Sequence, residues 1–217
     1  MDFEQARHNM VEQQIRTWEV LDLAVLELFE TIRREDFVPA AFRSLALADI
    51  NIPLAHAQVT MTPKVEGRLL QSLAIQRTDR VLEIGTGSGF LTALLGRCAA
   101  EVHSVDIFPE FTAAAPAKLG RYGIGNVQLY TGDGALGWPQ AGPYDAMVIT
   151  GSVPVLPDAY AGQLTQGGRL FVIVGQSPVM EAQLITRTPG GGFSHEVLFE
   201  TDLPPLLGLP APSAFRF

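Results

Sequence analysis

Cysteine is almost missing from this sequence, and its scarcity excludes two kinds of site. The 217 residues include one cysteine, Cys98, so neither an intrachain disulfide nor a cysteine-built metal centre can form. Cys98 lies in an apolar stretch, where a lone thiol is typical of helix packing. The four histidines show no metal-ligand spacing, so we expect no metal site. A chain without disulfides fits a reducing compartment, and we expect the cytoplasm.

Long apolar runs, a leader segment and a basic surface are missing as well. No run approaches the ~18 apolar residues of a membrane-spanning helix, and the mixed-charge N-terminus lacks the apolar stretch of a signal peptide. The formal net charge of −8 at pH 7 repels phosphate backbones. We therefore expect neither a membrane nor a nucleic acid as a partner. With 47% hydrophobic residues, the chain can bury a substantial core.

Residues 1–79 are expected to form N-terminal helices and a lid, packed on the main domain. Apolar residues at helical spacing predict two helices between residues 3 and 34, and Asp22 is expected to cap the second. Residues 46–63 are apolar but lose this spacing, and long irregular segments inside compact domains are usually functional. A further helix is expected from Val65 to Leu73.

The main domain, residues 80–217, alternates strand patterns with helix patterns. Strands are expected at residues 80–84, 101–106, 127–130, 146–150 and 169–174, and helices at 90–98, 109–122 and 156–164. This alternation predicts an α/β fold with a Rossmann-like, doubly wound, mostly parallel sheet. Two more strands, at 180–187 and 193–200, flank a glycine-rich turn and predict a C-terminal antiparallel hairpin, which makes about seven strands. The proline-rich tail, residues 204–217, is expected to lie along the surface.

A glycine-rich turn after the first strand is the strongest functional signal. Residues 81–90 read Val-Leu-Glu-Ile-Gly-Thr-Gly-Ser-Gly-Phe, so a ligand can approach the backbone closely at the strand's end. The G-x-G-x-G spacing differs from the G-x-G-x-x-G of nicotinamide dinucleotide sites. Glu83 would repel a pyrophosphate but tolerate the cationic end of S-adenosylmethionine. We predict that this cofactor is bound by Glu83, Gly85, Thr86, Gly87, Ser88 and Gly89. A tight turn without a ligand is the alternative.

Two later strands end near acidic residues that fit the same cofactor. Asp106 ends its strand 21 residues after Gly85, where a carboxylate can accept hydrogen bonds from both ribose hydroxyls, and Ile107 follows it. The sequence Gly132-Asp133-Gly134 follows the next strand, and an acid beside free backbone amides can bind an adenine ring. Taken singly, the first acid would be interpreted as a helix cap and the second as part of an ordinary turn.

The amino-acid sequences of these motifs resemble those of one family. Residues from about 10 to 187 resemble the protein-L-isoaspartate O-methyltransferases, which are class I S-adenosylmethionine-dependent methyltransferases. The shared features include residues 81–89, Gly132-Asp133-Gly134 before Gly137-Trp138-Pro139, Pro143-Tyr144-Asp145, Gly167-Gly168-Arg169-Leu170 and, upstream, Asp36-Phe37-Val38-Pro39. The resemblance implies repair of damaged proteins, by methylation of isoaspartyl carboxylates in proteins or peptides. It also implies that Asp49 and Gln58 lie in a lid, residues 46–63, that covers the cofactor and binds the isoaspartyl group.

One residue of this lid departs from the family. Where the family reads Thr-Ile-Ser-Gln-Pro, with an active-site serine, this chain has Val59-Thr60-Met61-Thr62-Pro63. Met61 takes the serine's place, so Thr60 or Thr62 is the candidate source of a hydroxyl, and these three with Asp49 form the candidate catalytic set. Two alternatives stay open. One is a methyltransferase of this fold that acts on another carboxylate or a small-molecule acceptor, and the other is a catalytically silent cofactor-binding protein.

The expected reaction does not need a general base. Methyl transfer from a sulfonium to a carboxylate is an in-line displacement, and a carboxylate with a pKa of about 4 is already ionised at pH 7. The lack of a convincing catalytic histidine or cysteine therefore does not argue against an enzyme. The glycine spacing disfavours a nicotinamide oxidoreductase, and Ile149-Thr150-Gly151-Ser152 stands where nucleic-acid amino-methylases carry Asp/Asn-Pro-Pro-Tyr/Phe. We expect a monomer or a homodimer.

Overall fold

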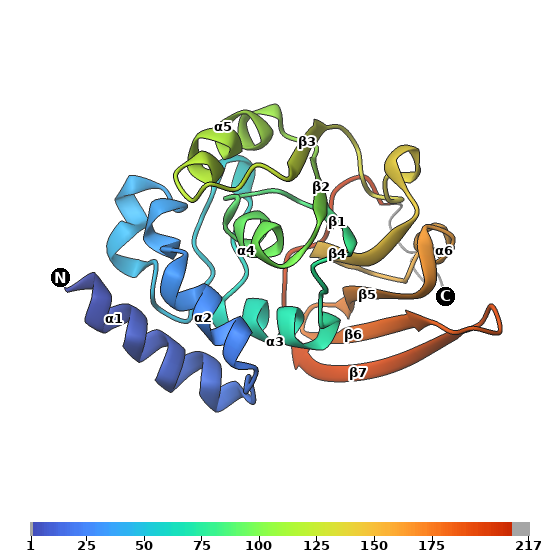
Figure 1. The fold of residues 1–217 in the computed structure, drawn as a ribbon, viewed down its shortest axis with the longest axis horizontal. Helices are drawn as coiled ribbons and strands as arrows, with labels where there is room; N and C mark the ends of the chain where they lie inside the picture. Colours follow the sequence, from blue (N-terminus) through green and yellow to red (C-terminus); the bar gives the residue numbers. More distant parts are fainter. Residues whose placement is uncertain (1, 210–217) are drawn as a thin grey trace, which may run out of the picture.

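One mixed sheet organises the molecule (Figure 1). The structure is a computed structural model, which describes residues 2–209. In these residues the sheet has seven strands in the order β3-β2-β1-β4-β5-β6-β7. They are β1 (Arg80–Ile84), β2 (Glu101–Asp106), β3 (Val127–Thr131), β4 (Tyr144–Val153), β5 (Leu164–Gln176), β6 (Val179–Arg187) and β7 (Phe193–Thr201). Strands β1 to β5 are parallel, whereas β6 and β7 are each antiparallel to the preceding strand. The predicted fold, including the C-terminal hairpin, is confirmed.

The helices begin and end close to where the sequence predicts, with one exception. They are α1 (Phe3–Met10), α2 (Leu23–Thr31), α3 (Pro63–Leu73), α4 (Phe90–Cys98), α5 (Pro109–Gly120) and α6 (Asp158–Ala161). Asp22 caps α2 as predicted, because its side chain accepts the backbone N–H of Ala24 at 2.8 Å. The prediction of a helix over residues 156–164 is wrong in extent. Leu164 already pairs with Tyr144 in the sheet, which leaves room for a single helical turn.

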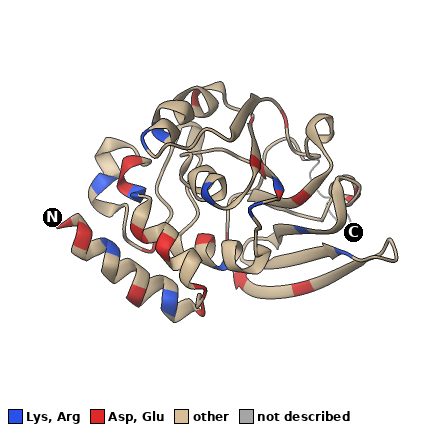
Figure 2. Ribbon diagram, viewed as in Figure 1, with Lys and Arg blue, Asp and Glu red and all other residues tan. Residues whose placement is uncertain are grey.

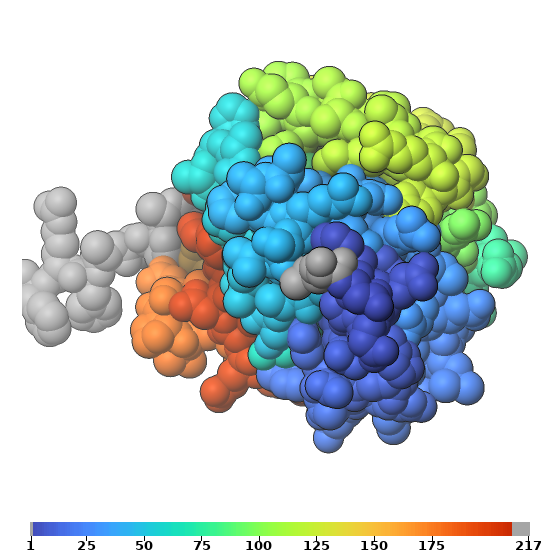
Figure 3. All heavy atoms as spheres, turned by 90° about the vertical axis from the view of Figure 1, so that its left-hand side faces the viewer, coloured from blue at the N-terminus to red at the C-terminus, as the bar shows by residue number. Residues whose placement is uncertain are grey.

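The two faces of the sheet carry different layers. Helices α3, α4 and α5 cover one face, and α1 and α2 pack onto them around a shared core (Figure 1). From outside, the N-terminal residues, in dark blue, lie directly against the lighter blue part of the chain (Figure 3). This core joins Phe29 of α2, Leu69 of α3 and Phe90 of α4 to Val81 of β1. The other face is covered more thinly, by the short turns of α6 and residues 139–141 and by the chain that follows β7. The N-terminal helices and the sheet are therefore parts of one packed unit.

Charged residues of both signs are spread over the ribbons (Figure 2). In residues 2–209, no three His, Cys, Asp or Glu side chains are grouped so that they could hold a metal ion. Within the same part of the chain, no helix combines the length and the apolar composition that crossing a membrane requires.

Residues 203–209 form a strap across the carboxyl end of β4. The backbone N–H of Ser152 donates to the Pro204 carbonyl at 3.0 Å, and the N–H of Leu206 donates to the Ser152 carbonyl at 2.8 Å. This part of the expected surface tail is therefore tied to the sheet, and it packs against the thinly covered face. The rest of that predicted tail, residues 210–217, lies outside the described residues.

Candidate functional site

The turn between β1 and α4 leaves its backbone open to a ligand. Gly85 has φ +100°, and a Cβ there would collide with the Thr150 side chain of β4. Gly87 has φ +50°, and its N–H donates to Asp106 Oδ2 at 2.9 Å. The Thr150 hydroxyl donates to the Ile84 carbonyl at 2.9 Å, which fixes the end of β4 beside the turn. Residues from three neighbouring strands thus hold the turn in place.

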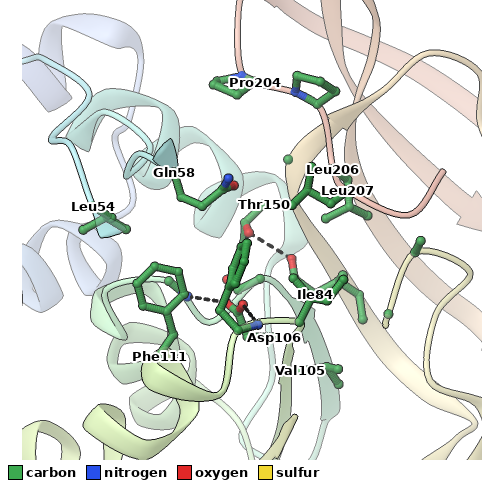
Figure 4. A pocket seen from close by; sticks show the side chains of 18 of the residues that line it. Leu54, Gln58, Ile84, Val105, Asp106, Phe111, Thr150, Pro204, Leu206 and Leu207 are labelled. Carbon is green, nitrogen blue, oxygen red and sulfur yellow. Dashed lines mark hydrogen bonds between the residues drawn. The ribbon is translucent and has the colours of Figure 1, made fainter. Parts of the chain in front are cut away.

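A cavity of about 80 Å³ lies at the carboxyl ends of β1, β2 and β4, and we call it the outer cavity (Figure 4). The strand order reverses there, and open parallel sheets bind ligands at such points. Its wall includes Gly85, Gly87, Asp106, Ile107, Asp133, Gly134 and Thr150, the lid residues Leu54, Gln58 and Val59, and the strap residues 203–207. Ligand cavities usually measure about 300–1,000 Å³. A ligand the size of a nucleoside must therefore push the lid or the strap outward.

Asp106 faces the outer cavity from the end of β2 (Figure 4). It is 7% exposed, and its two oxygens accept the backbone N–H groups of Gly87 at 2.9 Å and Phe108 at 3.0 Å. Burial raises the pKa of Asp106, and these N–H groups oppose that shift. A carboxylate offers about four acceptor sites, so about two are left for the hydroxyls of a ribose.

Asp133 and Gly134 line the same cavity where the strap crosses it. Asp133 Oδ1 accepts the N–H of Ala135 at 2.9 Å. Gly208 of the strap has φ +87° and passes so close that a Cβ on it would lie 2.7 Å from both Asp133 oxygens. The strap therefore closes the end of the cavity at which the sequence predicts the adenine.

A smaller cavity of about 40 Å³ adjoins the glycine turn, and we call it the inner cavity. It shares Leu54, Val59, Gly85, Gly87 and Thr150 with the outer cavity. Its remaining wall residues are Thr60, Met61, Glu66, Thr86, Ser88 and Leu91. Two of the predicted catalytic residues, Thr60 and Met61, thus lie at the same turn as the predicted cofactor residues.

The lid reaches the opposite wall of the outer cavity through an aromatic stack. Residues 52–60 form a tight loop with two backbone hydrogen bonds between its arms, and His56 at its tip has φ +57°. The His56 ring stacks on Phe108, and His56 Nε2 lies 3.3 Å from Glu110 Oε2. His56 lines neither cavity, so it acts as a contact between the lid and the β2–α5 turn.

Arg34 holds the inner edge of the lid. Its buried guanidinium donates to the carbonyls of Ala46 at 2.7 Å and Met61 at 2.6 Å, and to the Thr60 hydroxyl at 2.9 Å. Glu66 of α3 supplies the opposite charge, with Oε2 3.5 Å from Arg34 Nε. Burial lowers the pKa of Arg34 and raises that of Glu66 to about 7, while the attraction between the two charges opposes both shifts.

Glu83 lies beneath the glycine turn. Its fully buried carboxylate accepts the hydroxyls of Thr92 and Ser104, both at 2.6 Å, and Ser104 is bonded in turn to Thr86. Burial raises the pKa of Glu83 to about 8, against the effect of these two hydroxyls. Glu83 lines neither cavity, and its direct contact with a cofactor stays a prediction. It supports the turn from below.

Four other predicted site residues also lie outside both cavities. Asp49 pairs with Lys64 at 2.6 Å. Thr62 occupies the N-cap position of α3, and its buried hydroxyl has no hydrogen-bond partner among the described residues. Gly89 caps α4, and Gly132 follows the end of β3. The remaining predicted residues, including Gln58 and Ile107, all line one cavity or both.

Several wall residues are absent from the sequence-based prediction. Thr150 lies towards the carboxyl end of β4, beside the point at which the strand order reverses, so the topology alone points to it. Phe108 and Phe111 form an aromatic wall of the outer cavity. They follow Asp106 by two and five residues in the sequence, and this closeness to a predicted site residue is the signal that could have found them. Glu66 and the strap carry no local signal, because only folding brings them to the turn.

The fold and the site together define a class of protein. A Rossmann-like sheet with a G-x-G-x-G turn, an acid at the end of β2 and another after β3 is typical of class I S-adenosylmethionine-dependent methyltransferases. Within that class, the chain belongs to the protein-L-isoaspartate(D-aspartate) O-methyltransferase family, whose sequence model matches residues 5–207.

Similar proteins align with nearly the whole chain. A protein-L-isoaspartate O-methyltransferase from Rhodopseudomonas palustris is 38% identical over 200 residues, which cover 92% of this chain and 92% of the relative. One from Myxococcus xanthus is 39% identical over 195 residues, which cover 88% and 92%. The similarity to these family members therefore extends over most of the chain.

Two solved structures share the fold. A protein-L-isoaspartate O-methyltransferase superposes with a TM-score of 0.80 at 25% identity, over 93% of this chain and 66% of that chain. A protein from Plasmodium falciparum, described as such a methyltransferase in complex with S-adenosyl-L-homocysteine, gives a TM-score of 0.76 at 16% identity, over 95% and 98%.

Proposed function

We propose that this chain transfers the methyl group of S-adenosylmethionine to the carboxylate of L-isoaspartyl residues in damaged proteins or peptides. Membership of the family supports this reaction. One structural observation carries it: Asp106 faces the same cavity as the open backbone of Gly85 and Gly87. A carboxylate for a ribose beside a glycine turn is what the adenosine part of the cofactor requires.

The wall of the outer cavity fits adenosine. Asp106 has acceptor sites for the ribose hydroxyls, and Asp133 with the backbone of Gly134 suits the adenine. Gly85 and Gly87 carry no side chain that would fill the space beside the turn. When bound, the cofactor supplies an electrophilic methyl group on a sulfonium. The protein has to bind it, align the acceptor and exclude water.

The chain's own contribution is alignment of an ionised carboxylate with that methyl group. The acceptor, with a pKa of about 4, needs no general base at pH 7. Proximity and orientation contribute up to about 7–11 kcal/mol to such a reaction. Water is excluded by apolar side chains on two sides, Leu54 and Val59 from the lid and Leu203 and Leu206 from the strap. Cys98 takes no part, since burial raises the pKa of its thiol to about 11 and it lines neither cavity.

We assign the hydroxyl that replaces the family's serine to Thr60. Thr60 lines the inner cavity, whereas Thr62 does not. The Thr60 oxygen accepts hydrogen bonds from Arg34 at 2.9 Å and from the Ile52 N–H at 3.0 Å, so its own proton is free to be donated to a carboxylate. Met61 lines the same cavity as an apolar wall.

A matched pair of peptides tests the proposed reaction. The purified chain is incubated with methyl-labelled cofactor and with two peptides that differ only in an isoaspartyl or a normal aspartyl residue. We expect base-labile label on the isoaspartyl peptide alone, and much less label with the Asp106→Ala variant at low cofactor concentration. If neither peptide is labelled although calorimetry detects S-adenosylhomocysteine binding, the acceptor is a different one or the protein is catalytically silent.

We also propose the cytoplasm as its compartment, because a single cysteine fits a reducing environment. A monomer or a homodimer is our proposed state. Gel filtration with light scattering distinguishes these from higher assemblies.

A further inference from the structure

We infer that Glu66 receives the ammonium group at the amino-acid end of the cofactor, inside the inner cavity. The inference rests on the proposed function, because it takes S-adenosylmethionine as the ligand. It assigns a binding role to a residue that the glycine motif and the two strand-end acids do not include.

The order of the two cavities follows the order of groups in the ligand. Asp133 and Asp106, proposed for the adenine and the ribose, both line the outer cavity. Gly85 and Gly87 belong to both cavities. A molecule that runs from adenine through ribose and sulfur to an amino acid therefore carries its amino-acid end past the turn. The space on that path is the inner cavity, which Glu66 lines.

Glu66 is a buried acid whose carboxylate accepts no hydrogen bond from the described residues. It is 3% exposed, and its Oε2 has no hydrogen-bond partner among the described residues. The nearest cationic atom, Arg34 Nε, lies 3.5 Å away, beyond the ~3.2 Å limit of an ordinary N–H···O bond. Buried carboxylates are normally hydrogen-bonded, so a cavity-lining carboxylate whose oxygens accept no hydrogen bond from the described residues fits an incoming donor.

Arg34 does not use up the capacity of Glu66. Its terminal nitrogens are bonded to the Ala46 and Met61 carbonyls and to the Thr60 hydroxyl. It touches Glu66 only through the longer contact described above. Glu66 can therefore accept hydrogen bonds from a second cation that enters from the inner cavity.

The size and polarity of the inner cavity suit an amino-acid group. A water-sized group needs about 10–15 Å³, so 40 Å³ holds roughly three such groups. The same wall includes Thr86 and Ser88, from the turn that leads into α4, and helix N-termini favour negative charge. The ligand's carboxylate is therefore favoured at the turn and its ammonium at Glu66. Thr60 adjoins Val59, which both cavities share, so the acceptor approaches from that side.

Calorimetry with truncated nucleosides tests the assignment without relying on turnover. The probes are S-adenosylhomocysteine, 5′-methylthioadenosine, which lacks the amino-acid end, and two 5′-thioadenosines with either a 3-aminopropyl or a 3-carboxypropyl chain. For Glu66→Gln we expect at least tenfold weaker binding of S-adenosylhomocysteine and of the aminopropyl compound. Methylthioadenosine and the carboxypropyl compound should bind within twofold of their wild-type affinity.

A purely structural role gives a different pattern. If Glu66 only neutralises Arg34, Glu66→Gln weakens all four nucleosides alike or none of them, and either result overturns the assignment. Should Glu66→Gln not fold, as thermal melting would reveal, the wild-type protein still decides. There the aminopropyl compound must bind more tightly than methylthioadenosine, and equal affinities overturn the assignment. If no adenosine compound binds the wild-type protein, it is the proposed cofactor that fails, and this inference fails with it.

Discussion

The ring of His56 lies parallel to the ring of Phe108, with centroids 4.1 Å apart and an interplanar angle of 3°. His56 belongs to the tip of the lid, and Phe108 to the turn that follows Asp106 at the end of β2. Phe111 packs edge-on against the same imidazole, at 5.9 Å. This cluster joins two walls of the outer cavity, so opening the lid requires breaking it.

Removing this stack should loosen the lid. For His56→Ala we expect S-adenosylhomocysteine to dissociate roughly two- to tenfold faster, because an aromatic pair contributes about 0.5–1.5 kcal/mol. Stopped-flow displacement by a competing nucleoside measures the rate. The matched control is His195→Ala, on the exposed strand β7, which should leave the rate unchanged. Equal rates for wild type and His56→Ala would show that the stack does not hold the lid.

Asp106 should contribute strongly to cofactor affinity. We expect Asp106→Ala to weaken S-adenosylhomocysteine binding by about 1.5–3 kcal/mol, the range for hydrogen bonds to a charged group. Calorimetry measures the loss, and Glu196→Ala, an exposed acid on β7, serves as control. Asp106 also accepts the Gly87 N–H, so thermal melting must accompany the measurement. Unchanged affinity in a folded variant would refute the ribose assignment.

The buried carboxyl of Glu83 should make stability depend on pH. Its pKa is about 8 in the folded protein, against 4.5 as the ordinary value. The folded state thus binds more protons than the unfolded chain between these values, so this group's contribution to stability is present below pH 4.5 and is lost as pH rises to about 8. Glu83→Gln removes this titration but keeps an acceptor for Thr92 and Ser104.

Urea denaturation between pH 5 and pH 9 measures this effect. Relative to wild type, we expect the free energy of unfolding of Glu83→Gln to rise across the window, by on the order of a few kcal/mol. Subtracting the two curves isolates Glu83 from the other buried acids. A difference that stays constant with pH would show that Glu83 does not titrate there.

Met61 should contribute to the stability of the core, and replacing it by serine should not add a catalytic hydroxyl. It is a buried member of the main core, so Met61→Ser and Met61→Ala should each lower the free energy of unfolding by about 2–5 kcal/mol. If Thr60 supplies the hydroxyl, the serine variant should not exceed the alanine variant in kcat/KM, whereas Thr60→Val should lower kcat. A serine variant far more active than wild type would return the role to position 61.

The strap should detach when β4 gains a methyl group beneath it. A Cβ on Gly151 would lie 2.9 Å from the Leu206 nitrogen and 3.0 Å from its Cα, so the strap backbone must move. For Gly151→Ala we expect cleavage within residues 203–209 by a protease and weaker nucleoside binding. Gly190→Ala is the control, since a Cβ there meets nothing within 4 Å. Equal protection of both variants would contradict a closing role for the strap.

Much of the fold and part of the site follow from local sequence pattern. The strands and the turn at Gly85–Gly89 are encoded within short windows, and the register places Asp106 at the end of β2. The face of β1 on which the Glu83 side chain lies is also predictable from the sequence. Side chains alternate along a strand, so Glu83 shares the α4-covered face of Val81, while Ile84 faces the cavity side. Its charge suggested a ligand, but the alternation predicts burial.

The remaining features depend on residues far apart in the chain. No local pattern indicates that Gly208 lies on Asp133, or that Arg34 reaches Thr60 and Met61. Such contacts form because tertiary packing decides which polar groups share a buried space. The lid's position relative to the turn therefore emerges only from the folded molecule.

Ribosomes build a chain from its N-terminus, so the strap emerges after every strand of the sheet. A nascent molecule can therefore complete its sheet while the nucleoside pocket still has one side open. We expect the grip on the ligand to be gained among the last steps of biogenesis. A molecule cleaved between Thr201 and Leu203 would keep a native-like sheet but would bind the nucleoside more weakly. Ligand binding therefore reports whether the strap is intact.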